Sequence, residues 1–382
     1  MSSAKKKICM LAATPLTIHF FLKPHLIALA KEHDVTLLIN LANDNYLPPL
    51  DLPIRIISVP IMRKMSPFAD FRTLAVLMGF FRKSNYDLLI TVVSKAGLLG
   101  MTAGFLTGIP KRLHIFQGEV WANRSGFSRL LLKSCDWITA HLATNILAVS
   151  ASERAFLEEQ KVAEFGRIQV LGKGSIGGVN VDRFKPNPVL REYMRHELQI
   201  PLNATVLIFM GRLVADKGIR ELVKAYQEVH KSDHRLWLLL VGPDEEGEMR
   251  NFLNPLGDAS NQVRQIDYTN KPEEYLAAAD FLCLPSHREG FGVVIIEAAA
   301  MGIPAIGSKI YGISDAIIND QTGLLFEVKN SSQLQNCIQK LAKDVDLRSV
   351  LGSNARKNVE DHFESGRVIA GYIDYINRLL SR

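Results

Sequence analysis

The chain is poor in cysteine, and its cysteines are not spaced to bind a metal or to form a local disulfide. The four cysteines in a sequence of 382 residues include no CxxC pair, and most have apolar neighbours. Such residues are typical of reduced, buried thiols, so we expect a reducing compartment. They are Cys9, Cys135, Cys283 and Cys337.

The sequence also lacks a long apolar run. In the first half, the longest stretch without Asp, Glu, Lys, Arg or His is 96–110, which contains several glycines. It is shorter than the ~20 apolar residues that cross a bilayer. The basic residues Lys5–Lys7 precede an apolar segment that ends at Thr14-Pro15, too short for the core of a secretory signal. We therefore expect a cytoplasmic protein with no membrane-spanning helix and no secretory signal.

Positive charge is concentrated in the first half of the chain. Residues 1–180 carry 21 Lys and Arg against 12 Asp and Glu, whereas the whole chain carries 45 against 39. This asymmetry indicates that the first half meets an anionic surface. The sequence shows no nucleic-acid-binding motif and no interleaving of aromatic and basic residues. We expect an anionic membrane surface or a pyrophosphate-bearing substrate as the partner, and no nucleic acid.

Short apolar segments alternate with helical patterns along the chain. The 382 residues exceed the size at which a single hydrophobic core stops growing, so more than one domain is expected. The alternation predicts βαβ units and two doubly wound, Rossmann-like α/β domains that face each other across a cleft. Ligands of such domains bind at the carboxyl ends of the strands. The predicted strands are 7–13, 35–40, 54–59, 88–93, 113–116, 146–149, 168–171, 206–210, 236–241, 281–284 and 304–307, and the predicted helices include 20–31, 71–82, 98–106, 127–138, 217–230 and 294–301.

The boundary between the domains is predicted in the Gly- and Pro-rich segment 172–201. Residues Gly172–Gly177 formally match the dinucleotide pattern GxGxxG, but no helix pattern follows them. A nicotinamide-dependent oxidoreductase is therefore the weaker alternative, and an interdomain hinge is preferred. We expect an N-terminal domain at 1–180, a C-terminal domain at 181–364, and a last helix at 365–382 that crosses back to the first domain.

Two cations lie close together near the end of a predicted strand in the second half. Gly211-Arg212 ends the strand, and Lys217 opens the next helical pattern. Cations at the carboxyl end of a strand, beside the start of a helix, form a suitable site for a diphosphate. A solvated turn is the alternative interpretation.

Two glutamates flank a glycine turn further along the chain. Glu289 ends a strand, the segment 290–292 reads Gly-Phe-Gly, and Glu297 lies in the apolar helical pattern that follows Val293. The glycines allow backbone N–H groups to approach a ligand, and an unpaired buried carboxylate costs several kcal/mol, so a lone glutamate in an apolar helix suggests function. A surface-facing glutamate is the alternative.

This combination of Arg212, Lys217, Glu289 and Glu297 resembles glycosyltransferase family 4, whose members are retaining enzymes of the two-domain GT-B fold. The resemblance implies that Arg212 and Lys217, with Gly211, hold the donor diphosphate, and that Glu289 contacts the sugar hydroxyls. It further implies that Glu297 contacts the ribose and that the base lies near the segment 265–268. The donor-binding residues so expected are Gly211, Gly290, Phe291, Gly292, Val293, Glu297 and Tyr268, with Glu289, Arg212 and Lys217 as catalytic residues.

Polar residues also follow two predicted strands of the first half, in segments 94–99 and 114–124. These segments resemble those of bacterial O-antigen and capsule transferases that add an N-acetylhexosamine to an undecaprenyl-diphosphate sugar. Many family members place a histidine after the second strand, where this chain has Gln117, with His114 three residues earlier. The acceptor-binding candidates are His19, Lys95, Gln117 and Glu119, and each has a structural role as its alternative.

The resemblance implies transfer from a UDP-sugar, such as UDP-GalNAc, to a lipid-diphosphate-linked sugar in surface polysaccharide biosynthesis. We expect no cofactor beyond this donor substrate and no metal, because the single DxD, Asp344-Val345-Asp346, lies between amphipathic helices. A non-catalytic sugar-lipid binding protein of the same fold remains the alternative. Basic residues beside aromatic ones, in segments 61–68, 71–74 and 80–83, predict peripheral binding to the inner face of the cytoplasmic membrane.

Overall fold

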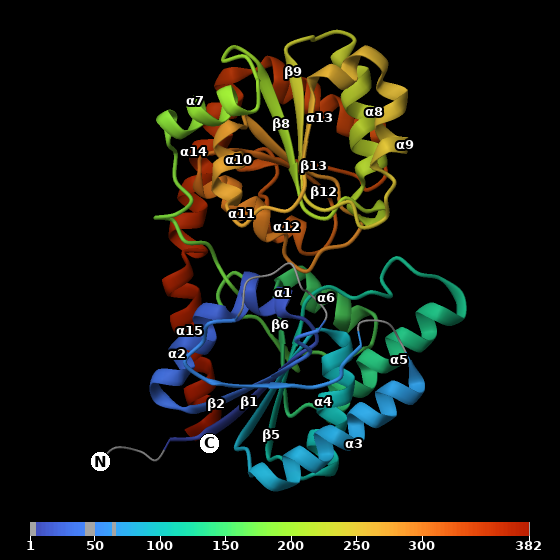
Figure 1. Ribbon diagram of the computed structural model, residues 1–382, viewed down its shortest axis with the longest axis vertical. Helices are drawn as coiled ribbons and strands as arrows, with labels where there is room; N and C mark the ends of the chain where they lie inside the picture. The colour runs from blue at the N-terminus through green and yellow to red at the C-terminus, as the bar shows by residue number, and fades with distance from the viewer. Residues whose placement is uncertain (1–4, 43–49, 63–65, 382) are drawn as a thin grey trace. The chain divides into compact units, whose positions relative to one another are not determined.

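The computed structural model describes residues 5–42, 50–62 and 66–381, and the chain folds into two compact units (Figure 1). The first unit comprises Met1–Gly177 together with Gly366–Arg382, and the second comprises Gly178–Ser365. Each unit is a parallel sheet flanked by helices, as the alternation of apolar and helical segments predicts.

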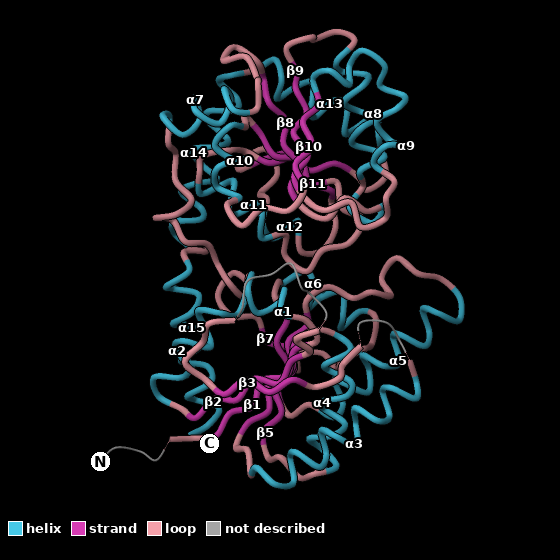
Figure 2. Tube along the Cα trace, in the orientation of Figure 1, coloured by secondary structure: helices cyan, strands magenta, loops and turns pink. Residues whose placement is uncertain are grey.

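The first unit is built on a seven-stranded sheet in the order β3-β2-β1-β4-β5-β6-β7, and every adjacent pair is parallel (Figure 2). The central strands are buried on both faces, which explains why they read as continuous apolar runs. The strands are β1 (Lys7–Ala12), β2 (Asp34–Ile39), β3 (Arg55–Ser58), β4 (Leu88–Val92), β5 (Lys111–Phe116), β6 (Asn145–Ala148) and β7 (Ile168–Gln169).

Helices cover the sheet of the first unit. The uncharged stretch 96–110 forms most of α4, a buried helix that packs against both α3 and α5. The final helix contacts the first unit, because Asn377 hydrogen-bonds His33 at 2.9 Å and the Lys111 ammonium donates to the Leu379 carbonyl at 2.6 Å. The helices are α1 (Pro15–Thr17), the π-helix η1 (Ile18–Leu22), α2 (Lys23–Glu32), α3 (Pro67–Ser84), α4 (Ser94–Leu106), α5 (Gly126–Leu142), α6 (Ala151–Glu159) and α15 (Ser365–Ser381).

The second unit has a six-stranded parallel sheet in the order β10-β9-β8-β11-β12-β13. Its strands are β8 (Thr205–Met210), β9 (Leu236–Val241), β10 (Val263–Ile266), β11 (Phe281–Leu284), β12 (Ala305–Ser308) and β13 (Gly323–Phe326). Its helices are α7 (Pro188–Glu197), the 3₁₀ helix η2 (Ala215–Lys217), α8 (Ile219–His230), α9 (Met249–Leu253), the 3₁₀ segment η3 (Asn254–Gln262), α10 (Pro272–Ala278), α11 (Val293–Ala300), α12 (Ile313–Ala316), α13 (Ser331–Lys343) and α14 (Val345–His362).

The sequence-based strand list omits β10 and β13, which are the two edge strands of the second sheet. The sequence of β10, Val-Arg-Gln-Ile, is only half apolar because an edge strand is partly exposed, and β13 is short and begins at a glycine. Helices α3 and α4 begin four residues earlier than their apolar patterns suggest. No helix within the described part of the chain is long and apolar enough to cross a membrane.

Candidate active site

The order of strands in each sheet marks the place where a ligand is expected. In the second unit the order reverses between β8 and β11, which are neighbours in the sheet but far apart in the sequence. Crevices form at the carboxyl ends of such strands, because their connections leave on opposite sides of the sheet. Arg212 follows β8 and Glu289 follows β11, so the topology brings together the two segments identified from the sequence.

Two glycines allow the turns at this edge to approach one another closely. Gly218 has φ of +71°, and a Cβ there would lie 2.1 Å from the Pro285 carbonyl oxygen. Gly242, in the turn after β9, has φ of +143°, and a Cβ there would lie 1.9 Å from the Gly211 carbonyl oxygen. No other residue tolerates both the backbone conformation and the contact. The two glycines therefore allow the turns after β8, β9 and β11 to pack directly against one another.

Lys217 and Glu289 form an ion pair at the end of the second sheet where the carboxyl ends of the strands lie. The two side chains are only 18% and 15% exposed, and Ser286 donates a further hydrogen bond to Glu289 Oε1 at 2.9 Å. Arg212 lies on the same edge, where its Nη1 contacts Glu245 Oε2 at 2.9 Å. The three residues expected to be catalytic thus lie at one end of one sheet, and the cations lie beside carboxylates.

A second group of contacts fixes the positions of these residues. His287 Nε2 bonds Glu221 Oε1 at 3.1 Å, and this hydrogen bond lowers the pKa of Glu221. The His287 backbone N–H donates to the Asp216 carbonyl at 2.8 Å, and Arg288 lies 3.7 Å from the Asp216 carboxylate. Glu221 and Asp216 were not identified from the sequence, since nothing local marks them. Together these contacts join the start of α8 to the turn after β11.

The glycine turn after β11 leads into α11. Gly292 adopts a left-handed conformation with φ of +71° and Val293 begins the helix, while the Phe291 side chain is buried against Phe363, with ring centroids 5.2 Å apart. The backbone N–H groups at 290–293 therefore belong to a turn at the start of a helix, where anions are favoured.

Glu297 lies on α11 and is half-buried. Burial raises its pKa to about 7, although the nearby Arg183 guanidinium favours the charged form. Arg183 is itself bonded to Glu273 at 2.7 Å. Glu297 is therefore poised between its neutral and ionised forms near pH 7.

Tyr268 follows β10, two strands from β8 at the same end of the sheet, and burial raises the pKa of its phenol.

The first unit has its own reversal of strand order, between β1 and β4. His19 lies in the π-helix η1 that follows β1, and Lys95 lies in the first turn of α4 after β4. The Lys95 ammonium pairs with Asp70 of α3 at 2.8 Å, and both side chains are mostly buried. The expected acceptor residues of these two segments are thus placed at one edge of the first sheet.

The segment after β5 is held by a buried carboxylate that the sequence reading missed. Gln117 is half-buried and Glu119 is buried. Glu153, at the start of α6, accepts hydrogen bonds from the backbone N–H of Gly118 and, at 2.8 Å, of Val149. The pattern Ser150-x-x-Glu153 is typical of a helix N-cap, and Ser150 indeed caps α6. That pattern marks the position of Glu153 but not its contact with Gly118 in the segment after β5.

A second buried carboxylate, Asp136 of α5, holds the same segment from another side. Asp136 Oδ2 accepts a hydrogen bond from the Trp121 indole at 2.7 Å, and both side chains are fully buried. Burial raises the pKa of Asp136 to about 6, while hydrogen bonds from Trp121 and Ser94 lower it. Asp136 therefore links the segment after β5 to the start of α4.

His114 lies in the core of the first unit. Its Nδ1 bonds Thr91 Oγ1 at 2.7 Å, and a Cβ on Gly97 would lie 2.4 Å from its Cε1. Burial lowers the pKa of His114 to about 3, so it stays neutral at physiological pH. Its role is structural, and Gln117 remains the candidate on this strand end.

Within 5–42, 50–62 and 66–381, no three His, Cys, Asp or Glu side chains come together as metal ligands. Asp344 of the DxD sequence caps α14, accepting the Leu347 N–H at 2.8 Å. After Gly172–Gly177 no helix begins until Pro188, so this segment does not present a helix to a dinucleotide.

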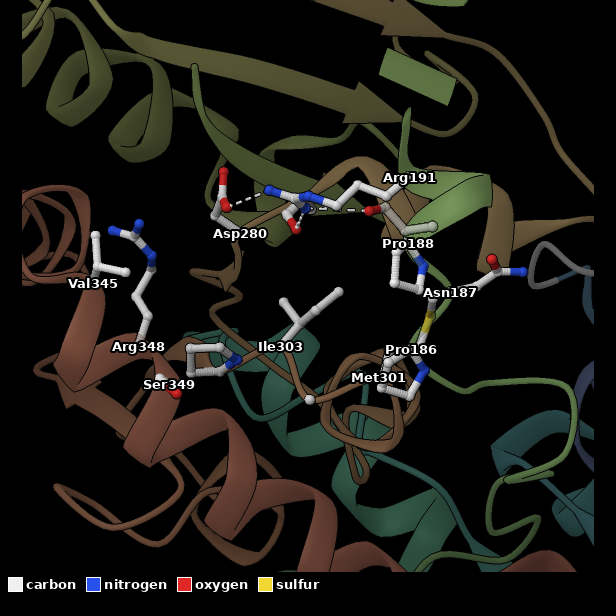
Figure 3. Close-up of a pocket in the computed structure, with 14 residues that line it drawn as sticks. Pro186, Asn187, Pro188, Arg191, Asp280, Met301, Ile303, Val345, Arg348 and Ser349 are labelled. Carbon is white, nitrogen blue, oxygen red and sulfur yellow. Dashed lines mark hydrogen bonds and ion pairs between the residues drawn. The ribbon is translucent and has the colours of Figure 1, made fainter. Parts of the chain in front are cut away.

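A pocket of about 340 Å³ lies at the opposite, amino-terminal edge of the second sheet (Figure 3). Arg191 reaches into it and bonds Asp280 Oδ1 at 2.6 Å, and Asp280 also bonds the buried Arg195 at 2.8 Å. Asp280 precedes β11 and Pro304 precedes β12, which places this pocket away from the strand ends that carry Arg212 and Glu289. We assign it to the structural framework of the second unit.

Comparison with known proteins identifies the class. Residues 191–358 match the family model "Glycosyl transferases group 1", and residues 27–174 match "Glycosyl transferase 4-like domain". The capsular polysaccharide biosynthesis glycosyltransferase CapM of Staphylococcus aureus is 31% identical over 80% of each chain. This chain therefore belongs to the group 1 glycosyltransferases with a family 4-like N-terminal domain.

Two further relatives are longer matches or carry more specific names. The N,N'-diacetylbacillosaminyl-diphospho-undecaprenol alpha-1,3-N-acetylgalactosaminyltransferase of Campylobacter jejuni is 26% identical over 94% of this chain and 95% of its own. The UDP-Gal:alpha-D-GlcNAc-diphosphoundecaprenol alpha-1,3-galactosyltransferase of Escherichia coli is 25% identical over 82% and 81%. Among solved structures, sucrose-phosphate synthase of Thermosynechococcus elongatus aligns with a TM-score of 0.81 and 20% identity over 99% and 100% of the two chains, which confirms the predicted GT-B fold.

Proposed function

We propose that this glycosyltransferase moves an N-acetylhexosamine from a UDP-sugar to an undecaprenyl-diphosphate-linked sugar, with retention at the anomeric carbon and without a metal. The observation that carries the donor half is the meeting of two cations, a glutamate and a glycine turn where the strand order reverses. Arg212 and Lys217 supply positive charge, and the turn before α11 supplies backbone N–H donors. Both kinds of group bind the phosphate oxygens of a nucleoside diphosphate.

The donor roles follow from this arrangement. Arg212 and Lys217, with the turn at Gly211, hold the diphosphate, and Glu289 accepts hydrogen bonds from the sugar hydroxyls once the donor has drawn Lys217 toward its phosphates. Glu297 bonds the ribose, and the base lies beside Tyr268. Backbone N–H groups toward the phosphates and sugar come from Gly290, Phe291, Gly292 and Val293.

The reaction breaks the bond between the sugar C1 and the diphosphate oxygen. The acceptor hydroxyl oxygen bonds to C1 on the face that the diphosphate leaves, and its proton passes to an oxygen of the departing phosphate. Retention results because attack and departure share a face. Negative charge grows on the diphosphate during this step, so preorganised cations such as Arg212 and Lys217 stabilise the transition state more than the ground state.

The acceptor roles are assigned to the first unit. Lys95 lies in the first turn of the 13-residue helix α4, where its ammonium and the positive end of the helix dipole favour a phosphate. Binding a diphosphate requires Lys95 to share its charge between Asp70 and the ligand. His19, Gln117 and Glu119 follow β1 and β5 at the same edge of the sheet and are assigned to the acceptor sugar.

The names of the relatives support the choice of substrates. The Campylobacter jejuni relative is named for transfer of N-acetylgalactosamine to an undecaprenyl-diphosphate-linked sugar, and the match covers nearly the full length of both chains. The name of the Escherichia coli relative specifies a UDP-sugar donor and a diphosphoundecaprenol acceptor. The proposed N-acetylhexosamine agrees with the Campylobacter jejuni name and the UDP-linked donor with the Escherichia coli name, although the latter relative is named for galactose. A role in surface polysaccharide biosynthesis agrees with the name of the Staphylococcus aureus relative CapM.

A lipid-linked acceptor requires the enzyme to reach a membrane, and we assign this role to helices α3 and α5. Both pack against α4 and lie on one side of the first unit (Figure 1). Helix α5 exposes an apolar stripe at helical spacing, and the start of α3 exposes two phenylalanines, Phe68 being 94% exposed. The exposed apolar residues are Phe68, Phe71 and Val76 of α3 and Phe127, Leu130, Leu131, Trp137 and Ile138 of α5.

Exposed basic residues border these side chains, including Arg72, Lys83 and Arg124. Aromatic and aliphatic side chains flanked by cations are typical of surfaces that bind anionic lipid headgroups. Parts of the sequence-based expectation differ in the structure: Ile61 and Phe81 are buried in the core, and Phe80 packs partly buried against it. Arg63–Met65 lie outside the described residues. We propose that this surface attaches the protein peripherally to the inner face of the cytoplasmic membrane.

Flotation with lipid vesicles tests this surface. We expect the protein to float with phosphatidylglycerol-rich vesicles more than with neutral ones, and the double variant Phe127→Ser/Leu131→Ser to lose most of that binding. Phe165→Ser is the matched control, because Phe165 is 92% exposed but lies outside α3 and α5. Equal flotation with both lipids, or equal losses in the two variants, contradicts the assignment.

The transfer itself is tested with a panel of nucleotide sugars and a short-chain polyprenyl-diphosphate sugar as acceptor. We expect mass spectrometry to detect addition of an N-acetylhexosamine from its UDP donor, and NMR to show that the donor's anomeric configuration is retained. Activity in excess EDTA is expected to equal activity with added magnesium. UDP binding without transfer to any lipid-linked sugar would instead indicate a binding protein, and activity restored only by a divalent ion refutes the metal-free mechanism.

A further inference from the structure

An acidic segment lies directly beside the cations assigned to the donor diphosphate. The turn after β9 reads Pro243-Asp244-Glu245-Glu246-Gly247-Glu248. It is joined to the turn after β8 by a backbone hydrogen bond from Leu213 N–H to the Pro243 carbonyl at 2.9 Å. Strands β8 and β9 are neighbours in the sheet, so the two turns leave the same edge side by side.

Two carboxylates of this segment bond to the turn that carries Arg212. Glu245 Oε2 lies 2.9 Å from Arg212 Nη1, and Glu246 Oε2 accepts the backbone N–H of Ala215 at 3.0 Å. A guanidinium and a backbone N–H are also the groups that bind phosphate oxygens in proteins. Glu245 and Glu246 thus place negative charge on a turn assigned to a negatively charged ligand.

The acidic segment has a defined shape. Asp244 accepts the backbone N–H groups of Glu248 at 3.2 Å and Met249 at 3.1 Å, which ties the segment to the start of α9. Gly247 turns the chain with φ of +67°. Glu248, by contrast, points to Asn251, which donates to its carboxylate at 3.1 Å. Glu248 therefore shares the charge and location of its neighbours but bonds no group of the turn after β8.

We propose that Glu245 and Glu246 act as an internal anion that competes with the donor diphosphate for the turn after β8. The proposal rests on the diphosphate role assigned to Arg212 above. In the ligand-free protein the carboxylates neutralise Arg212 and bond Ala215, and they are displaced when the nucleotide binds. After transfer they return, which weakens the hold on the product nucleoside diphosphate and speeds its release.

The size of the effect follows from exposure. The Arg212 and Glu245 side chains are 37% and 30% exposed, so solvent screens their interaction. Exposed ion pairs contribute little, and removing this competitor should tighten nucleotide binding by about two- to fivefold. The effect depends on phosphate charge, so it should be absent for a ligand that contains the base and ribose alone.

Calorimetric titration of the full-length protein with UDP and with uridine tests the proposal, in wild type and in the variants Glu245→Gln, Glu246→Gln and Glu248→Gln. We expect the first two to bind UDP about two- to fivefold more tightly and to release it more slowly in stopped-flow measurements. Uridine binding should not change in any variant, and Glu248→Gln should match wild type. Thermal unfolding verifies that each variant is folded.

A second comparison isolates the contact with Arg212. In an Arg212→Ala background, Glu245→Gln should no longer alter UDP binding, because the group for which it competes is gone. UDP affinity that is unchanged or weaker in folded Glu245→Gln and Glu246→Gln overturns the proposal while leaving the diphosphate site intact. Wild-type protein that binds no nucleoside diphosphate refutes the proposed function, and this inference with it.

Discussion

The ion pair between Lys217 and Glu289 leads to a prediction that distinguishes a diphosphate ligand from a structural lysine. Lys217→Met removes the ammonium but keeps most of the apolar stem, and Glu289→Gln keeps the shape of the partner. The donor carries phosphates and a sugar, and the two residues are assigned to different parts of it. Their substitutions should therefore have different effects on UDP, which has the phosphates but no sugar.

The structure sets the magnitudes. Both side chains are less than a fifth exposed, so after Lys217→Met the Glu289 carboxylate keeps only the hydrogen bond from Ser286 at 2.9 Å among the contacts described above. We expect a loss of about 1–2 kcal/mol in unfolding free energy, between the values for exposed and fully buried pairs. The loss of charge stabilisation should raise the transition-state free energy by about 2–4 kcal/mol, which lowers kcat/KM roughly 30- to 1000-fold.

The assay combines UDP titration with transfer kinetics. Lys217→Met should weaken UDP binding, whereas Glu289→Gln should leave it unchanged or tighten it, because the ammonium loses its competing carboxylate. Both should lower kcat/KM, and in the double variant the effects should be non-additive because the residues are in contact. Equal weakening of UDP binding by both variants, or UDP binding unaffected by Lys217→Met, refutes the assignment of Lys217 to the diphosphate.

Four further predictions concern other residues. Arg212→Ala should reduce transition-state stabilisation, measured from kcat/KM, by about 2–4 kcal/mol. Unchanged turnover in this variant would contradict the assignment of Arg212 to the donor site. Lys95→Ala should raise the KM for a diphosphate-linked acceptor far more than for one without the diphosphate; equal changes would make Lys95 structural. Burial raises the pKa of Asp136 to about 6 in the folded protein, above its value in the unfolded chain. The contribution of its protonation to the unfolding free energy is therefore fully present below about pH 4 and is lost as the pH rises through 6. The unfolding free energy of Asp136→Asn relative to wild type should therefore increase by about 3 kcal/mol over that range, and a difference independent of pH contradicts the burial argument. Asp280→Ala leaves the buried Arg195 without its carboxylate and should cost about 3–5 kcal/mol in chemical denaturation, whereas a cost below about 1 kcal/mol would show that the pair contributes little.

Much of the fold could be predicted because its signals are local. Strands buried on both faces read as apolar runs, and the helices between them carry a helical period, so the central strands and the doubly wound class were correct. The edge strand β10 escaped detection because a partly exposed strand does not need a continuous apolar sequence, and β13 did so because it is only four residues long and begins at a glycine. The true start of α3 at Pro67 was missed because its first turn is largely exposed and carries no buried apolar stripe.

The candidate site was only partly predictable. Arg212, Lys217 and Glu289 were found because each lies beside a glycine turn at the end of a strand, which is a short-range pattern. The carboxylate partners of Arg212 and of the neighbouring His287 were not, since Glu245 and Glu221 occupy ordinary-looking acidic positions on other elements. The same holds for the first unit, where Asp70 pairs with Lys95 and Glu153 holds the backbone of Gly118.

The sequence by itself determined which residues carry charge at strand ends, where glycines permit tight turns, and hence the chemistry that each turn can offer. Only the tertiary structure decided which turns meet. Lys217 and Glu289 are 72 positions apart, and they are in contact because β8 and β11 are neighbours at the point where the strand order reverses. Strand order depends on packing over the whole sheet, whereas a turn depends on a few adjacent residues, so the partners of each charge could be read only from the folded chain.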